Sequence, residues 1–274
     1  MSSCSELAAA AGEALAGSAS QASRWLLLEV RGSWGRDAVA DSGLPDLARQ
    51  RLEAWAAEPG TRVLLLRRPE RRSGPLALFL ARSDAGGGEL RRLQLERLDD
   101  LAGAELEGGD PHGPLWLVCA HGRRDPCCAR LGRPLLDALA GLVPAGSLWQ
   151  SSHQGGHRFA ANVLVLPYGI QLGRVGPADA AAVVGRVEAG EIPVDHYRGR
   201  TFQPPEVQAA EAHLRRTLDA PGIDAIRLVE GRGDELVFET PAGRRSVRVA
   251  ALPGPSRPES CGAEPAASTR FAVA

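Results

Sequence analysis

Strand-length apolar segments alternate with amphipathic stretches along this chain, and their order is the strongest constraint on its fold. In the first half, the pattern predicts a helix over residues 45–57 and strands over 25–30, 62–67, 76–81 and 90–95. In the second half, it predicts helices over 129–142 and 177–189 and strands over 115–118, 147–150, 162–166 and 168–175. The same order of strand, helix, strand and strand pair thus occurs twice, which predicts an α/β fold of two related units.

Loop-forming residues mark the boundaries of these units. The stretch 105–114 is rich in glycine, proline and acidic residues, so we expect one domain over residues 1–110 and a second over 111–199. A helix over 205–218 then precedes three alternating segments joined by tight turns, which predicts a small helix plus β-meander segment over 200–252. The tail, 253–274, is rich in proline, serine and alanine and is expected to be irregular.

Charge and hydropathy narrow the classes of partner. With 274 residues the chain is long enough for about two domains. Its net charge of −1 lacks the cationic excess typical of proteins that bind nucleic acids or anionic membranes, so we expect neither partner. The N-terminus resembles no signal peptide, and no apolar run reaches the roughly 18 residues of a membrane span. These features predict a cytoplasmic protein.

The cysteines do not form the evenly paired framework of a small secreted domain. The chain has five, two of them adjacent, and in a reducing cytoplasm clustered thiols are more often ligands or redox centres than disulfides. Three lie within ten residues: Cys119 at the end of a predicted strand, and Cys127 and Cys128 just before a predicted helix. Cys119 and one of the later pair can reach a common metal, and we favour Cys128 because a helix N-terminus stabilises a thiolate.

A second motif begins at Ser151, 23 positions after Cys128 (151 − 128 = 23). His153 and His157 have the i, i+4 spacing of the helical zinc-protease motif H-E-x-x-H. Gln154, however, stands where that motif has its glutamate, and two glycines follow it. We therefore expect a loop that delivers two imidazoles to one ligand. Two cysteines and two histidines suit either zinc or a [2Fe–2S] cluster, and the wide C-x₈-C spacing leans toward iron–sulfur.

The two motifs, together with the following strand that ends in Pro167-Tyr168-Gly169, resemble the sucrase/ferredoxin-like family, which is related to thioredoxin-like [2Fe–2S] ferredoxins. The resemblance extends from Cys4 to about Gly199. It implies two tandem thioredoxin-like units, of which the first is degenerate and holds no cluster. Carried over by position, the cluster ligands would be Cys119, Cys128, His153 and His157.

With two imidazoles in place of two thiolates, such a cluster would be Rieske-like, with a potential in the range of roughly −150 to +300 mV. The resemblance thus implies a one-electron carrier or redox sensor that exchanges electrons with an unidentified redox protein or reductase. No paired-carboxylate motif supports sucrase activity, and we expect a carrier or sensor rather than a catalyst.

Other residues near the motifs receive lower-ranked roles. His121 and Cys127 are the alternative ligands, whereas Cys4 and Cys261 are assigned to reduced surface or packing positions. The arginines of the motifs are expected to be solvated or to form ion pairs. Two alternative functions stay open: a thiol oxidoreductase or sensor that uses Cys127 and Cys128, and a zinc-stabilised interaction module.

Overall fold

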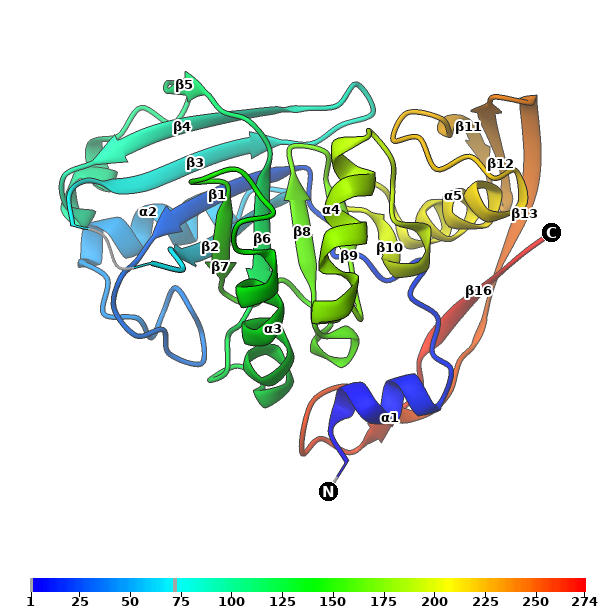
Figure 1. Ribbon diagram of the computed structural model, residues 1–274, viewed down its shortest axis with the longest axis horizontal. Coiled ribbons are helices and arrows are strands. Elements are labelled where there is room, and N and C mark those ends of the chain that lie inside the picture. The colour runs from blue at the N-terminus through cyan, green and yellow to red at the C-terminus, as the bar shows by residue number, and fades with distance from the viewer. Residues whose placement is uncertain (1, 71–72) are drawn as a thin grey trace.

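The computed structural model of the protein describes residues 2–70 and 73–274. Its centre is a twisted ten-stranded sheet with the order β10-β9-β8-β6-β7-β2-β1-β3-β4-β5 (Figure 1). The strands are β1 (Arg24–Glu29), β2 (Thr61–Arg67), β3 (Leu76–Arg82), β4 (Glu89–Leu95), β5 (Asp110–Pro111), β6 (Leu115–Cys119), β7 (Leu148–Ser151), β8 (Val163–Leu166), β9 (Ile170–Leu172) and β10 (Tyr197–Arg200).

One pattern of strand pairing occurs twice in this sheet. Strand β1 is parallel to β2 and antiparallel to β3, which pairs with β4. Strand β6 is likewise parallel to β7 and antiparallel to β8, which pairs with β9. A parallel pair needs a crossover, and the crossovers contain α2 (Asp46–Ala56) and α3 (Pro126–Leu139). The α/β class predicted from the alternating segments is therefore confirmed.

The two halves of the sheet share a core. Strands β2 and β7 join them in an antiparallel pair, and one apolar cluster combines Leu27 and Phe79 of the first half with Trp149 and Leu164 of the second. Helix α2 covers a second cluster, and α3 covers a third together with α4 (Ala180–Glu188). Burial on both faces of the central strands explains why they are continuous apolar runs in the sequence.

The C-terminal segment forms a second sheet beside helix α5 (Pro205–Thr217). Its strands are β11 (Arg227–Arg232), β12 (Glu235–Thr240), β13 (Gly243–Pro253) and β16 (Thr269–Val273). The prediction of an irregular tail over 253–274 was wrong, because β16 pairs with the end of β13 and brings Phe271 and Val273 against α5 and its sheet. Two residues each form β14 (Arg257–Pro258) and β15 (Pro265–Ala266).

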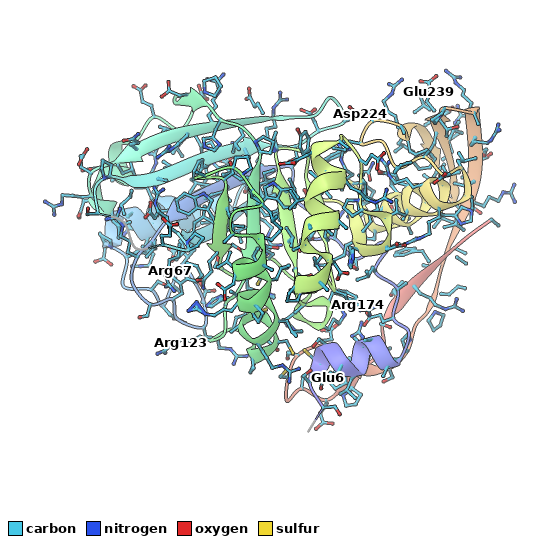
Figure 2. All side chains as sticks on the ribbon, viewed as in Figure 1. Glu6, Arg67, Arg123, Arg174, Asp224 and Glu239 are labelled. Carbon is cyan, nitrogen blue, oxygen red and sulfur yellow. The ribbon has the colours of Figure 1, made fainter. Side chains whose placement is uncertain are left out.

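The N-terminal helix and part of the C-terminal tail meet below the main sheet. Helix α1 (Cys4–Ala10) lies beside the C-terminal segment that carries β14 (Figure 1). The buried Glu13 carboxylate pairs with Arg257 of that segment and with Arg158 of the main domain. Arg174, labelled in Figure 2, donates hydrogen bonds to the carbonyls of Ala8 and Glu13. The N-terminal segment and the tail segment at Arg257 are thus fixed against the domain that carries the two motifs.

Short 3₁₀ segments complete the fold at Leu98–Gly103, His157–Phe159, Pro177–Asp179 and Val194–His196. Within the described part of the chain, no helix has both the length and the apolar character needed to cross a membrane.

Candidate metal centre

Helix α3 brings the later cysteines of the first motif to the end of β6. It begins three residues before the predicted position, with the Asp125 side chain as its N-cap, so that Cys127 and Cys128 lie in its first turn. Gly132, one turn later, lies against Cys119, where a Cβ atom would collide with the Cys119 carbonyl. Only glycine allows α3 to pack this closely on β6, which brings Cys128 near Cys119.

Three of the predicted ligands converge into a first donor group, consisting of Cys119, Cys128 and His153. One donor atom from each lies within 4.8 Å of the others. His153 Nδ1 is 3.9 Å from Cys119 Sγ and 3.7 Å from Cys128 Sγ, and both cysteines are fully buried. The hydrogen bond from Cys128, aided by His153, holds the pKa of the Cys119 thiol well below its ordinary value despite burial. A buried thiolate beside an imidazole is a donor set typical of a metal centre.

Two glycines shape the loop that carries the imidazoles. Gly155 and Gly156 have φ values of 94° and 70°, and the 3₁₀ turn that follows starts at His157. Left-handed backbone favours glycine, and a Cβ atom at Gly156 would also collide with the Arg198 guanidinium. The side chain of Gln154 is buried and donates to Leu117 O and Ser151 Oγ. Gln154 thus holds the loop to the sheet.

Arg198 supports the same loop through hydrogen bonds. Its fully buried guanidinium donates hydrogen bonds to the carbonyls of Gly155 and Ser18, and to Asn162 Oδ1. Asn162 in turn donates to the Gly156 carbonyl. Sequence reasoning missed this residue, because Arg198 lies on β10, 41 positions after His157 (198 − 157), and no local pattern marks it.

His157, the fourth predicted ligand, lies beside the first donor group. Its ring centroid is 5.1 Å from that of His153, while its Nδ1 is 3.4 Å from Asp125 Oδ2 and 3.7 Å from Cys4 Sγ. Burial lowers the pKa of His157, and the Asp125 carboxylate only partly offsets this effect. A lowered pKa favours the neutral imidazole, which is the form that binds metals.

Cys127 points into a second donor group, consisting of Cys4, Asp125, Cys127 and Cys261, whose donor atoms also lie within 4.8 Å of one another. Cys127 Sγ is 3.5 Å from Cys4 Sγ and 3.3 Å from Cys261 Sγ. Cys4 and Cys261, expected in reduced surface or packing roles, are both free and pack against Cys127 at the start of α3. The only sequence signal was one cysteine near each end.

The remaining motif residues make other contacts. His121 is buried, with its Nε2 2.7 Å from the Gly35 carbonyl and its ring edge-on to Trp34. Its Nδ1 has no hydrogen-bond partner within the described residues. Arg158 forms an ion pair with Glu13, which agrees with the structural role expected for the motif arginines.

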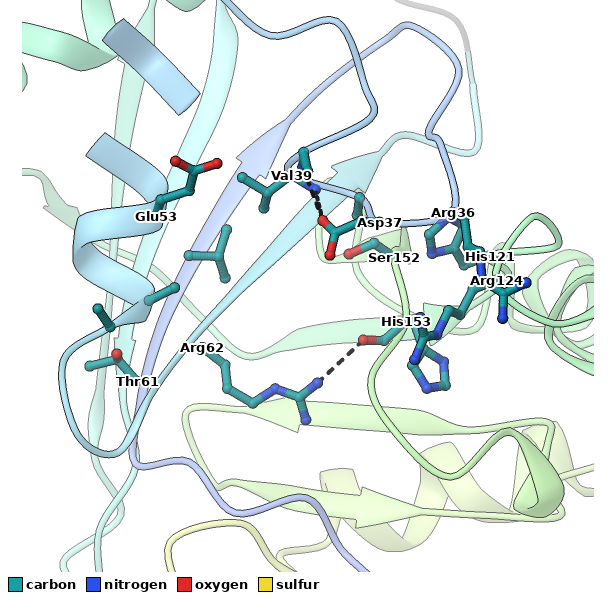
Figure 3. A pocket seen from close by; sticks show the side chains of 15 residues that line it. Arg36, Asp37, Val39, Glu53, Thr61, Arg62, His121, Arg124, Ser152 and His153 are labelled. Atoms are coloured by element: carbon teal, nitrogen blue, oxygen red, sulfur yellow. Dashed lines mark hydrogen bonds between the residues drawn. The ribbon is translucent and has the colours of Figure 1, made fainter. Parts of the chain in front are cut away.

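A cavity of about 600 Å³ opens beside the first donor group (Figure 3). His121, Arg124 and His153 line one side of it, with Arg36 close by, whereas Glu53 lies at the far end on α2. The imidazole of His153 thus borders a cavity whose adjacent wall carries cationic side chains.

Comparison with known proteins places the chain in a family. The sequence profile of the sucrase/ferredoxin-like family matches residues 15–199, which include the whole first donor group and His157. The chain belongs to the sucrase/ferredoxin-like family. This sucrase/ferredoxin-like protein is 35% identical over 109 residues to altered inheritance of mitochondria protein 32 from Meyerozyma guilliermondii. That match covers 35% of the chain and 37% of the relative, so it spans little more than a third of either.

Two solved structures of a thioredoxin-like [2Fe–2S] ferredoxin from Aquifex aeolicus also match, one of them a cysteine-to-serine variant. Their sequence identities are 19% for the variant and 20% for the other, with TM-scores of 0.28 and 0.30. The matches cover 31% and 34% of this chain, and 97% and 94% of the ferredoxin chains.

Proposed function

We propose that this sucrase/ferredoxin-like protein binds a [2Fe–2S] cluster through Cys119, Cys128, His153 and His157. The observation that carries the proposal is the convergence of two buried cysteines and an imidazole, with a second imidazole ring 5.1 Å from the first. Two sulfur and two nitrogen donors are the set found at Rieske-type clusters. The wide C-x₈-C spacing of the two cysteines supports an iron–sulfur cluster over zinc.

Each residue has a distinct task in this proposal. The Cys119 and Cys128 thiolates would bind one iron. His153 would bind the second iron through Nδ1, the nitrogen that already faces both sulfurs. Because His157 Nδ1 faces the Asp125 carboxylate, its Nε2 would bind the second iron. A carboxylate that orients a ligating histidine in this way also raises its basicity. When bound, the cluster would supply reversible one-electron transfer.

The electron would leave or enter on the side of the imidazoles. His153 borders the cavity, whose near wall carries Arg36 and Arg124. Opposite charges guide electron-transfer partners into position, so we infer that the partner is a redox protein or reductase with an acidic surface around its own cofactor. A reducing compartment such as the cytoplasm would keep the five thiols free for ligation. We assign the protein to electron transfer or redox sensing.

Electron paramagnetic resonance of the dithionite-reduced full chain tests this function. We expect the signal of a reduced [2Fe–2S] centre, its loss in Cys119→Ala and in Cys128→Ala, and a cluster of lower potential in His157→Cys. Cys127→Ala is the matched control, because its sulfur belongs to the second donor group, and it should retain the signal. A protein that stays colourless after anaerobic reconstitution with iron and sulfide would overturn the proposal.

A further inference from the structure

Three sulfur atoms form a compact triangle at the N-terminus of α3. The Sγ atoms of Cys4, Cys127 and Cys261 are 3.5, 3.3 and 3.6 Å apart. These distances exclude disulfides, which need about 2.05 Å, and all five cysteines of the chain are free. Three thiolates bound to one Zn²⁺ at about 2.3 Å would be about 3.8 Å apart in a tetrahedral site. The triangle is therefore within a few tenths of an ångström of the size that zinc requires.

Asp125 supplies the fourth donor. Both of its carboxylate oxygens lie 3.9 Å from Cys4 Sγ, and the side chain is 1% exposed. The backbone N–H groups of Cys127 and Cys261 donate to these oxygens at 2.8 and 2.9 Å. Such contacts fix the orientation of a ligating carboxylate. Ser5 Oγ also donates to Cys127 Sγ at 3.4 Å, so the site has outer hydrogen bonds on sulfur as well as oxygen.

The position of the triangle indicates what it holds together. Its cysteines come from α1, from the first turn of α3 and from the tail between β14 and β15. Apolar burial at this junction is small, since the local cluster consists of the three sulfurs with only Ala160 and the half-buried Leu131. Holding α1 and the tail segment together costs conformational entropy. Where little apolar surface is buried, a structural metal is a common means of offsetting that cost.

We propose that Cys4, Cys127, Cys261 and Asp125 bind one Zn²⁺, which fastens α1 and the tail segment between β14 and β15 to helix α3. The site is separate from the cluster proposed above, and it shares no ligand with it. The part of the chain that matches the family profile, residues 15–199, includes neither Cys4 nor Cys261. Two of the four proposed zinc ligands therefore lie outside the part of the chain that the family profile matches.

Metal and acid-labile sulfide analysis of the full-length protein, purified under reducing conditions with zinc and iron supplied, tests the proposal. We expect one Zn²⁺ per chain. The double variant Cys4→Ser/Cys261→Ser should lose zinc and keep iron and sulfide, whereas Cys119→Ser/Cys128→Ser should lose iron and sulfide and keep zinc. This crossed pair separates failure of the zinc site from failure of the cluster.

Three further measurements guard the test against misfolding of the double variants. Cobalt supplied in place of zinc should give the wild type the visible absorption of a tetrahedral thiolate site, and Cys4→His, which replaces one zinc ligand by another, should retain zinc. Chelation of the wild type should make α1 and the tail susceptible to limited proteolysis, and added zinc should reverse this. Substoichiometric zinc in the wild type, or full zinc occupancy in Cys4→Ser/Cys261→Ser, would overturn the proposal.

Discussion

The Asp125 carboxylate, a member of the second donor group, lies 3.4 Å from Nδ1 of His157, the imidazole beside the first donor group. Asp125 is also the N-cap of α3, accepting a hydrogen bond from Cys127 N–H. One side chain therefore positions the helix that carries Cys128 and the imidazole expected to bind the second iron.

Replacing Asp125 by Asn should change the electrochemistry of the cluster, and it also removes the carboxylate of the zinc site proposed above. Asparagine is a good N-cap, but it removes a negative charge that favours the oxidised cluster and raises the pKa of the His157 imidazole. We expect a higher reduction potential, with its pH-dependent region shifted to lower pH, measured by spectroelectrochemistry across pH. Asp125→Glu keeps the charge and is the control. Identical potentials in Asn and Glu variants would contradict this role.

Gly156→Ala should disrupt the imidazole loop. An alanine at this position would be forced into the left-handed backbone conformation. Its methyl group would also collide with the Arg198 guanidinium, which holds the loop. Gly233→Ala is the matched control, since its φ of 61° imposes a similar backbone cost but its Cβ would meet no atom within 4 Å. We expect each variant to lose about 1 kcal/mol for the backbone, and Gly156→Ala alone to lose iron. Equal iron contents would argue against this packing.

The stability of the cluster-free protein should fall in mildly acidic solution. Burial lowers the pKa of both His121 and His157, so below the unfolded pKa of about 6.5 the unfolded chain binds more protons than the folded one. This contribution is fully present above that pH and is lost as pH falls through the folded pKa values. In denaturant titrations, the free energy of unfolding of His121→Gln should fall less steeply with decreasing pH than that of the wild type. The two slopes should differ by at most about 1.4 kcal/mol per pH unit. A slope equal to that of wild type would contradict the effect.

Local sequence patterns were enough to predict most strands and the two motifs, for physical reasons. Strands such as β6 and β8 are buried on both faces, so they read as short apolar runs. Cys119 and Cys128 are near in sequence, and the glycines at 155 and 156 signal a left-handed turn. These features need no knowledge of distant residues.

Contacts between distant residues left no comparable signal. Cys4 and Cys127 are separated by 123 positions, and Cys127 and Cys261 by 134. The sequences around Cys4 and Cys261 look like ordinary polar terminal segments. Only in the folded protein do both cysteines lie beside the start of α3. The buried support of Arg198 was missed for the same reason, and β16 was missed because Phe271 and Val273 are too few to outweigh the tail's proline and serine.

Reversing the charge of Arg124 should slow electron exchange with anionic partners. Arg124 is exposed on the cavity wall beside His153, and its side chain belongs to neither donor group. We expect Arg124→Glu to keep its cluster spectrum but to be oxidised more slowly by ferricyanide, an anion, and faster by a cationic cobalt complex. Stopped-flow absorbance at low ionic strength measures both rates, and added salt should reduce the difference.

Arg232→Glu is the control for this charge reversal. Arg232 lies on β11, far along the chain from the cavity, and its side chain is 84% exposed, so the substitution alters the net charge equally without placing a carboxylate near His153. Its rates with both reagents should change less than those of Arg124→Glu, because the electrostatic interaction with a reagent at His153 weakens with distance from the substituted charge. If both variants change the rates alike, net charge rather than the cavity wall guides the partner. If neither does, electrons enter and leave elsewhere on the surface.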